Sequence, residues 1–108
     1  MKVLVLLKLA ADAKPADLAA LEAPEAQRVW ELYEAGDLLE IYLFADGSGA
    51  ALVLRAGDAD AALALTQSLP MVAAGKLEPQ ALPLTVWPQM SKLLAKHGRD
   101  TPAWMSAG

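Results

Sequence analysis

The segment VLVLLKL, residues 3–9, limits most strongly what this chain can fold into. In an extended conformation both of its faces are largely apolar: Val3, Val5, Leu7 and Leu9 on one side, Leu4 and Leu6 on the other. A strand that is apolar on both faces is normally covered on both faces. We therefore expect a buried strand here, with other parts of the protein, or a second protein, on each side.

The same segment could also be interpreted as part of a secretory signal peptide. Ala11-Asp12-Ala13 resembles a signal-peptidase site, and a lysine precedes the apolar run. The run is short for such a signal, however, and Lys8 interrupts it. The strand interpretation is favoured, and no window approaches the roughly 18 uninterrupted apolar residues of a membrane span.

Periodicity and turn residues predict the remaining elements. A helical region from Pro15 to Glu34, which Pro24 could kink, ends at Gly36, and Ala26, Val29, Trp30 and Tyr33 form its apolar stripe. A hairpin joins strands 38–44 and 50–55 through the turn Asp46-Gly47-Ser48-Gly49. Asp58 caps a helix over 59–68 that Pro70 ends. Strand 77–87 contains Pro79 and Pro83, which confine it to a sheet edge, and helix 89–97 follows.

The order β-α-β-β-α-β predicts an α+β, ferredoxin-like fold, in which two helices cover one face of a four-stranded antiparallel sheet. We expect one domain over residues 1–98, with a short C-terminal helix, and a tail over 99–108. The helix-free face would carry Leu4 and Leu6 or the alternate set, which is too apolar to leave in water. A homodimer, or a larger assembly of dimers, would cover it.

Composition restricts the partners and the chemistry. The chain has 108 residues, a net charge of −4 and no cysteine. This charge argues against nucleic-acid binding, because phosphate contacts need clustered lysine and arginine. The absence of cysteine excludes disulfides and thiolate chemistry and fits a cytoplasmic location. His97 is the only histidine and no second ligand is spaced to join it, so no metal is expected.

The segment PEAQRVWELYEAG, residues 24–36, with Lys8-Leu9 before it and Leu69-Pro70 after the second helix, resembles the muconolactone isomerase family. The resemblance spans roughly residues 2–88. It implies a dimeric α/β barrel of ferredoxin-like subunits that works without a cofactor. Members of that family shift a double bond in a small unsaturated lactone acid, with a carboxylate that moves the proton.

By position, the resemblance implies that Glu25 is this carboxylate, that Lys8 lies near the pocket, and that Tyr42 occupies the place of a family tryptophan. Residues 49–54, GAALVL, are nearly all apolar, whereas the family has aromatic, asparagine and serine side chains there. The ligand expected here is therefore a small organic molecule that is more apolar than a lactone acid.

Each candidate residue also has an ordinary structural interpretation. Glu25 could be a base whose pKa is raised by burial, or a solvated carboxylate in a helical first turn, where the helix dipole would lower its pKa. Lys8 could stabilise a developing negative charge on oxygen or could extend into solvent. Arg28 fits an ion pair with Glu25, three residues earlier on the same helix, and Trp30 and Tyr42 fit either a ligand cavity or the core.

Three functions remain open from the sequence. The first is isomerisation by cofactor-free proton transfer, with Glu25 and Lys8 as catalytic residues and Tyr42, Trp30 and Arg28 around the substrate. The second is a non-catalytic module for small-molecule binding or assembly. The third is a cofactor-independent monooxygenase, because the same fold serves several reactions.

Overall fold

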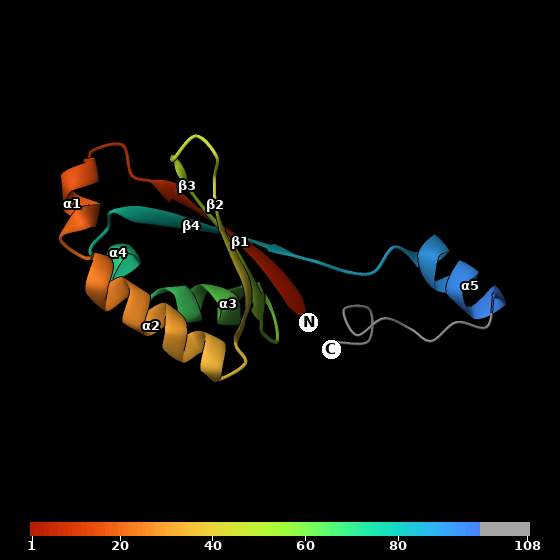
Figure 1. Ribbon diagram of the computed structural model, residues 1–108. Coiled ribbons are helices and arrows are strands. Elements are labelled where there is room, and N and C mark those ends of the chain that lie inside the picture. Colours follow the sequence, from red (N-terminus) through yellow and green to blue (C-terminus); the bar gives the residue numbers. More distant parts are fainter. Residues whose placement is uncertain (98–108) are drawn as a thin grey trace.

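The computed structural model describes residues 1–97, in which helices cover one face of a four-stranded sheet (Figure 1). The elements follow the chain in the order β1 (Lys2–Leu9), α1 (Pro15–Ala19), α2 (Glu22–Glu34), β2 (Leu38–Leu43), β3 (Gly49–Arg55), α3 (Ala59–Thr66), α4 (Pro70–Ala73), β4 (Leu77–Pro83) and α5 (Pro88–Lys96). The strand order is β2-β3-β1-β4 and every pairing is antiparallel. The predicted α+β ferredoxin-like fold is confirmed.

The central strand β1 has one face in the core and one face away from the helices. Val3, Val5 and Leu7 are at most 2% exposed. Leu52 and Leu54 of β3 pack in the same core, together with Leu32, Leu38, Ala50, Ala62, Leu69, Val72 and Leu77. Leu4, Leu6 and Lys8 point to the other side, because successive side chains of a strand alternate.

The hairpin between β2 and β3 forms at the glycine-containing turn that the sequence predicted. Gly47 has a φ of 76°, a left-handed conformation that favours glycine. Gly49 lies directly against β1, so that a Cβ at this position would collide with the carbonyl oxygen of Leu7. The turn is further fixed by Asp46, whose Oδ1 accepts a hydrogen bond from the Ser48 amide at 2.9 Å.

Strand β2 does not alternate regularly between the two faces of the sheet along its whole length. A bulge between Leu38 and Glu40 shifts the pairing with β3, so that Leu38 lies opposite Leu54 and Ile41 lies opposite Leu52. Leu38 therefore belongs to the helix-covered face and is 2% exposed. Further along that face the helices no longer reach the strand, and Leu43 is 81% exposed.

The helical region after β1 is two helices, not the single kinked one that was expected. The chain leaves the helical path at residues 20–21, and Pro24 lies in the first turn of α2, where its missing N–H costs nothing. The expected stripe is also wrong in part. Leu32 is the buried residue of α2 and Val29 packs beside it, whereas Trp30 is 55% exposed.

The C-terminal part departs from the expectation in three places. Helix α3 ends at Thr66, and Pro70 begins the short helix α4, as proline at a first helical position often does. Strand β4 ends at Pro83 and, as its prolines required, is an edge strand. Helix α5 lies away from the sheet, beyond an extended segment (Figure 1). The expected tail, and with it the domain boundary at residue 98, lies outside the described residues.

The helix-free face of the sheet has an apolar centre and a charged edge. Leu4, Leu6 and Val53 lie at its centre, and Lys2, Lys8, Glu40, Arg55 and Glu78 surround them. This distribution is typical of protein interfaces. The predicted second subunit on this face stays a prediction. Within residues 1–97, no helix has both the length and the apolar character needed to cross a membrane.

Candidate functional site

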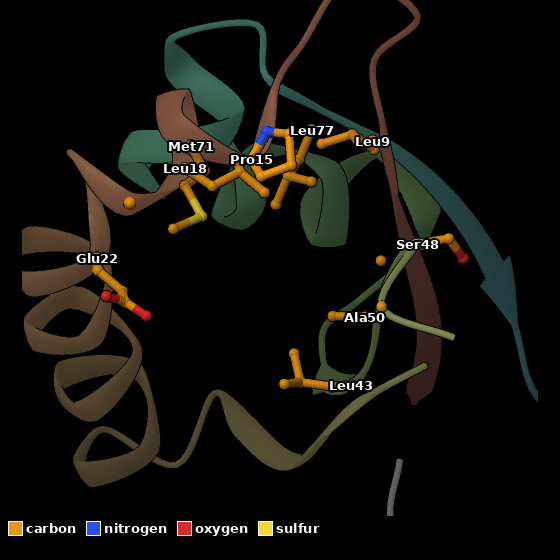
Figure 2. Close-up of a pocket in the computed structure, with 12 residues that line it drawn as sticks. Leu9, Pro15, Leu18, Glu22, Leu43, Ser48, Ala50, Met71 and Leu77 are labelled. Atoms are coloured by element: carbon orange, nitrogen blue, oxygen red, sulfur yellow. The ribbon is translucent and has the colours of Figure 1, made fainter. Parts of the chain in front are cut away.

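A pocket of about 310 Å³ opens beyond the end of the helix-covered core (Figure 2). It lies between helices α1, α2 and α4 on one side and the β2–β3 hairpin on the other. The residues that line it are mostly apolar or small: Leu9, Pro15, Leu18, Ala19, Glu22, Leu43, Gly47, Ser48, Gly49, Ala50, Met71 and Leu77.

Two side chains face each other across the hollow. Figure 2 shows the Glu22 carboxylate directed inward from α2 and the Leu43 side chain directed inward from β2. Leu18 of α1 and Met71 of α4 line a further side of the hollow. The pocket thus exists because α2 covers the sheet only as far as Leu38 and diverges from the exposed end of β2.

Glu22 is the one ionisable residue of the lining. The other polar side chain, Ser48, is directed away from the hollow in Figure 2. Its hydroxyl donates a hydrogen bond of 2.6 Å to Oδ1 of Asp46. The interior therefore presents one carboxylate on an otherwise apolar surface.

Glu25 lies one helical turn after Glu22 and behind the pocket wall. Its Oε1 accepts a hydrogen bond of 2.9 Å from the Met71 amide. Burial raises the pKa of Glu25 above its ordinary value, and the hydrogen bond from Met71 opposes that change. Glu25 is not a lining residue, but it touches one, since Met71 forms part of the wall.

The contact between Glu25 and Met71 has a local explanation. Helix α4 begins at Pro70, and its N-cap residue Leu69 has no side chain that can accept a hydrogen bond. The first amides of a helix lack partners within it. Glu25 supplies an acceptor from a different helix, and thus connects α2 to the turn that carries Met71.

The structure does not bring Lys8 and Tyr42 to the pocket of the same chain. Both lie on the helix-free face: Lys8 pairs with Gly49 and Glu78, and Tyr42 pairs with Ala51. Tyr42 is 60% exposed. Its hydroxyl donates to Oε1 of Glu40 at 3.0 Å, an interaction that raises the pKa of Tyr42.

Arg28 and Trp30 also lie outside the lining. Arg28 Nε donates a hydrogen bond of 2.9 Å to Ser68 Oγ, and its Nη1 lies 3.6 Å from Glu31 Oε1. The ion-pair partner of Arg28 is thus Glu31 and not Glu25, as was expected. Trp30 packs against Tyr33, with ring centroids 5.7 Å apart, on the outer surface of α2.

The sequence analysis missed Glu22. Its signal was present, because Glu22 precedes Glu25 by three residues and both lie on one helical face. Among residues 1–97, no group of three or more histidine, cysteine, aspartate or glutamate residues is placed to hold a metal ion.

The fold and the pocket define a ferredoxin-like α+β protein with a hollow between its helices and its hairpin. No family model matches the chain, and no curated protein matches it. A solved structure of muconolactone isomerase, determined at 3.3 Å resolution, is similar, with a TM-score of 0.63. The two chains are 21% identical, and the match covers 82% of this chain and 92% of that one. At this identity the likeness shows the fold alone, so membership of the family stays a prediction.

Proposed function

We propose that this protein binds a small, largely apolar organic molecule in the pocket between α2 and the β2–β3 hairpin. The observation that carries this proposal is the pocket itself, whose volume of about 310 Å³ lies at the small end of the usual range for ligand sites. Its walls are apolar with one inward carboxylate, the kind of lining that such sites have. The similar fold of muconolactone isomerase supports a site of this class.

A second proposal, cofactor-free proton transfer, is favoured by one feature of Glu25. A half-buried carboxyl group with a raised pKa gains and loses a proton closer to neutrality, as a base acting on carbon requires. The reaction would be a double-bond shift in a small unsaturated carbonyl compound or lactone. Because Lys8 and Tyr42 lie on the other face of the sheet, this proposal rests on Glu25 alone within one chain.

The binding proposal is tested with a variant that fills the pocket. Ala19 lines the hollow from a surface position, so Ala19→Trp should occupy it without disturbing the core. Titration with benzyl alcohol, followed by amide NMR, should shift the signals of Leu43, Ala50 and Met71 in the unsubstituted protein. The shifts should disappear in Ala19→Trp and persist in Ala64→Trp, which adds the same side chain at an exposed position of α3. Equal shifts in both variants would place binding elsewhere.

The proton-transfer proposal is tested by conversion of 3-cyclohexenone to 2-cyclohexenone, a reaction that moves one proton and one double bond. The unsubstituted protein should accelerate it, and Glu25→Gln should return the rate to that of buffer. Glu34→Gln, an exposed position on the same helix, should leave the rate unchanged. If Glu25→Gln retains the full rate, Glu25 is not the base.

We further propose that a second copy of this chain covers the helix-free face of the sheet. The apolar centre formed by Leu4, Leu6 and Val53, with its charged surround, supports this arrangement. In a homodimer, or an assembly of such dimers, the second copy would remove these apolar side chains from water.

A further inference from the structure

We propose that the pocket selects its ligand by head group: it takes small apolar amines and rejects carboxylates of the same size. This inference rests on the proposed binding function and goes beyond it by naming the chemical class. It follows from the charges that the structure places in the pocket and from those that it keeps away.

The lining presents a single charge. Of the twelve lining residues, Glu22 is acidic, and none is lysine, arginine or histidine. Its carboxylate is directed into the hollow in Figure 2. Within the described part of the chain, Glu22 has no ion-pair partner, since the two salt bridges there join Arg28 to Glu31 and Lys76 to Asp17.

The cations near the pocket are held elsewhere or face solvent. Lys76 follows the pocket wall in sequence, but its Nζ lies 3.6 Å from Oδ2 of Asp17. Lys8 projects from the opposite face of the sheet. Lys14 is exposed just before Pro15 and is not a lining residue. A ligand carboxylate in the hollow would therefore meet Glu22 without a compensating positive charge.

No lining hydroxyl is free to donate a hydrogen bond to a ligand carboxylate. Ser48, the other polar lining side chain, already donates its hydroxyl hydrogen to Asp46. An ionised carboxylate only accepts hydrogen bonds, so its natural partner is a donor, and a charged donor forms the stronger bond. An ammonium group on Glu22 satisfies this requirement.

The remaining walls fit the apolar body of such a ligand. Leu43 lies across the hollow from Glu22, and Leu18 and Met71 line a further side of it (Figure 2). A molecule of benzyl size can place its ring against these side chains while its head group reaches Glu22. The methionine sulfur adds a polarisable surface for an aromatic ring.

Benzylamine, benzyl alcohol and benzoate are the probes for this proposal, because they share a ring and differ in charge. Affinities are measured by calorimetry at low salt, with amide NMR to locate binding. Glu22 is solvent-accessible, so the expected preference is modest: benzylamine about fivefold tighter than benzyl alcohol, and benzoate at least fivefold weaker than the alcohol. Added salt should reduce both differences.

Glu22→Gln removes the charge at nearly constant volume, and in this variant the three probes should bind within about twofold of one another. Glu34→Gln removes one charge from the far end of the same helix and should keep the original order. Benzoate binding as tightly as benzylamine, or an unchanged order in Glu22→Gln, would overturn the head-group proposal and leave the binding function standing. If none of the probes shifts the pocket amides, the binding function falls and this inference falls with it.

Discussion

Burial and a hydrogen bond act on the pKa of Glu25 in opposite directions. Two interpretations of this residue predicted opposite pKa shifts: a solvated carboxylate near a helix start would have a lowered pKa, and a buried one a raised pKa. The pKa is raised, because burial outweighs the hydrogen bond from the Met71 amide. The same carboxylate connects α2 to α4 through this hydrogen bond.

The raised pKa of Glu25 predicts a pH-dependent stability difference between the unsubstituted protein and Glu25→Gln. The folded protein holds this proton more tightly than the unfolded chain, so stability falls as pH rises from the ordinary glutamate value of 4.5 through the raised folded value. Glutamine cannot lose a proton, and its carbonyl still accepts from Met71. In urea unfolding, the variant should gain stability relative to the unsubstituted protein as pH rises through this window, and the gain should level off above it.

Glu34→Gln is the matched control for this measurement, since it replaces an exposed glutamate of the same helix. Its stability relative to the unsubstituted protein should show no comparable rise with pH. A Glu25→Gln difference that shrinks as pH rises would mean that the hydrogen bond, and not burial, dominates the pKa of Glu25.

At the scale of single residues, helical spacing predicted which side chains are buried better than it predicted which side chains reach the pocket. That Glu25 is partly buried follows from the helical spacing that places it on the face of Val29 and Leu32. That Glu22 reaches the pocket does not, because Pro24 signals a break in the helix but not the angle at which α2 leaves residues 20–21. Local sequence signals report such breaks poorly when tertiary packing decides them.

At the scale of elements, the junction between α3 and α4 determines the pocket wall. Leu69 is fully buried and lies between the two helices, while Pro70 begins the helix that presents Met71. Arg28 and Glu25 both reach this junction from α2, through Ser68 and the Met71 amide. The position of the wall thus depends on a packed leucine and on two polar contacts.

Leu69→Ala should lower the free energy of unfolding by about 2–5 kcal/mol, the usual cost of an emptied leucine site in a well-packed core. Leu69 is 0% exposed and belongs to the main core cluster. Leu63→Ala, a half-buried position on α3, should cost clearly less. Urea titration at neutral pH measures both. Equal losses in the two variants would mean that the junction is not rigidly packed.

The elements themselves were largely predictable, and the exceptions share a physical reason. Periodicity and turn residues identified all four strands, the hairpin and the cap at Asp58, whose Oδ1 accepts from the Ala61 amide at 2.7 Å. The bulge at Leu38–Glu40 and the short helix at Pro70 were not foreseen. Both depend on how neighbouring elements pair and pack, which the order of residues along one segment does not state.

At the scale of the whole molecule, the feature that matters is how strand β1 is covered on its two sides. Its helix-covered side is complete, with Val3 and Val5 fully buried. Its other side carries Leu4 and Leu6, which remain partly accessible in a single chain. The alternation that the sequence displayed therefore predicted the sheet correctly, and the second subunit expected on the uncovered side stays a prediction.

Leu6→Glu should convert the protein from a dimer, or an assembly of dimers, to a monomer. Leu6 lies on the central strand of the helix-free face, opposite Ala51 and Gln80, so a new carboxylate there would be trapped without a partner when two faces meet. Sedimentation velocity should show the loss of the larger species, while circular dichroism confirms that the variant is folded. Gln67→Glu, which adds the same charge at an exposed position after α3, should leave the assembly unchanged. An unsubstituted protein that sediments as a monomer would show instead that the apolar centre of this face is tolerated in water.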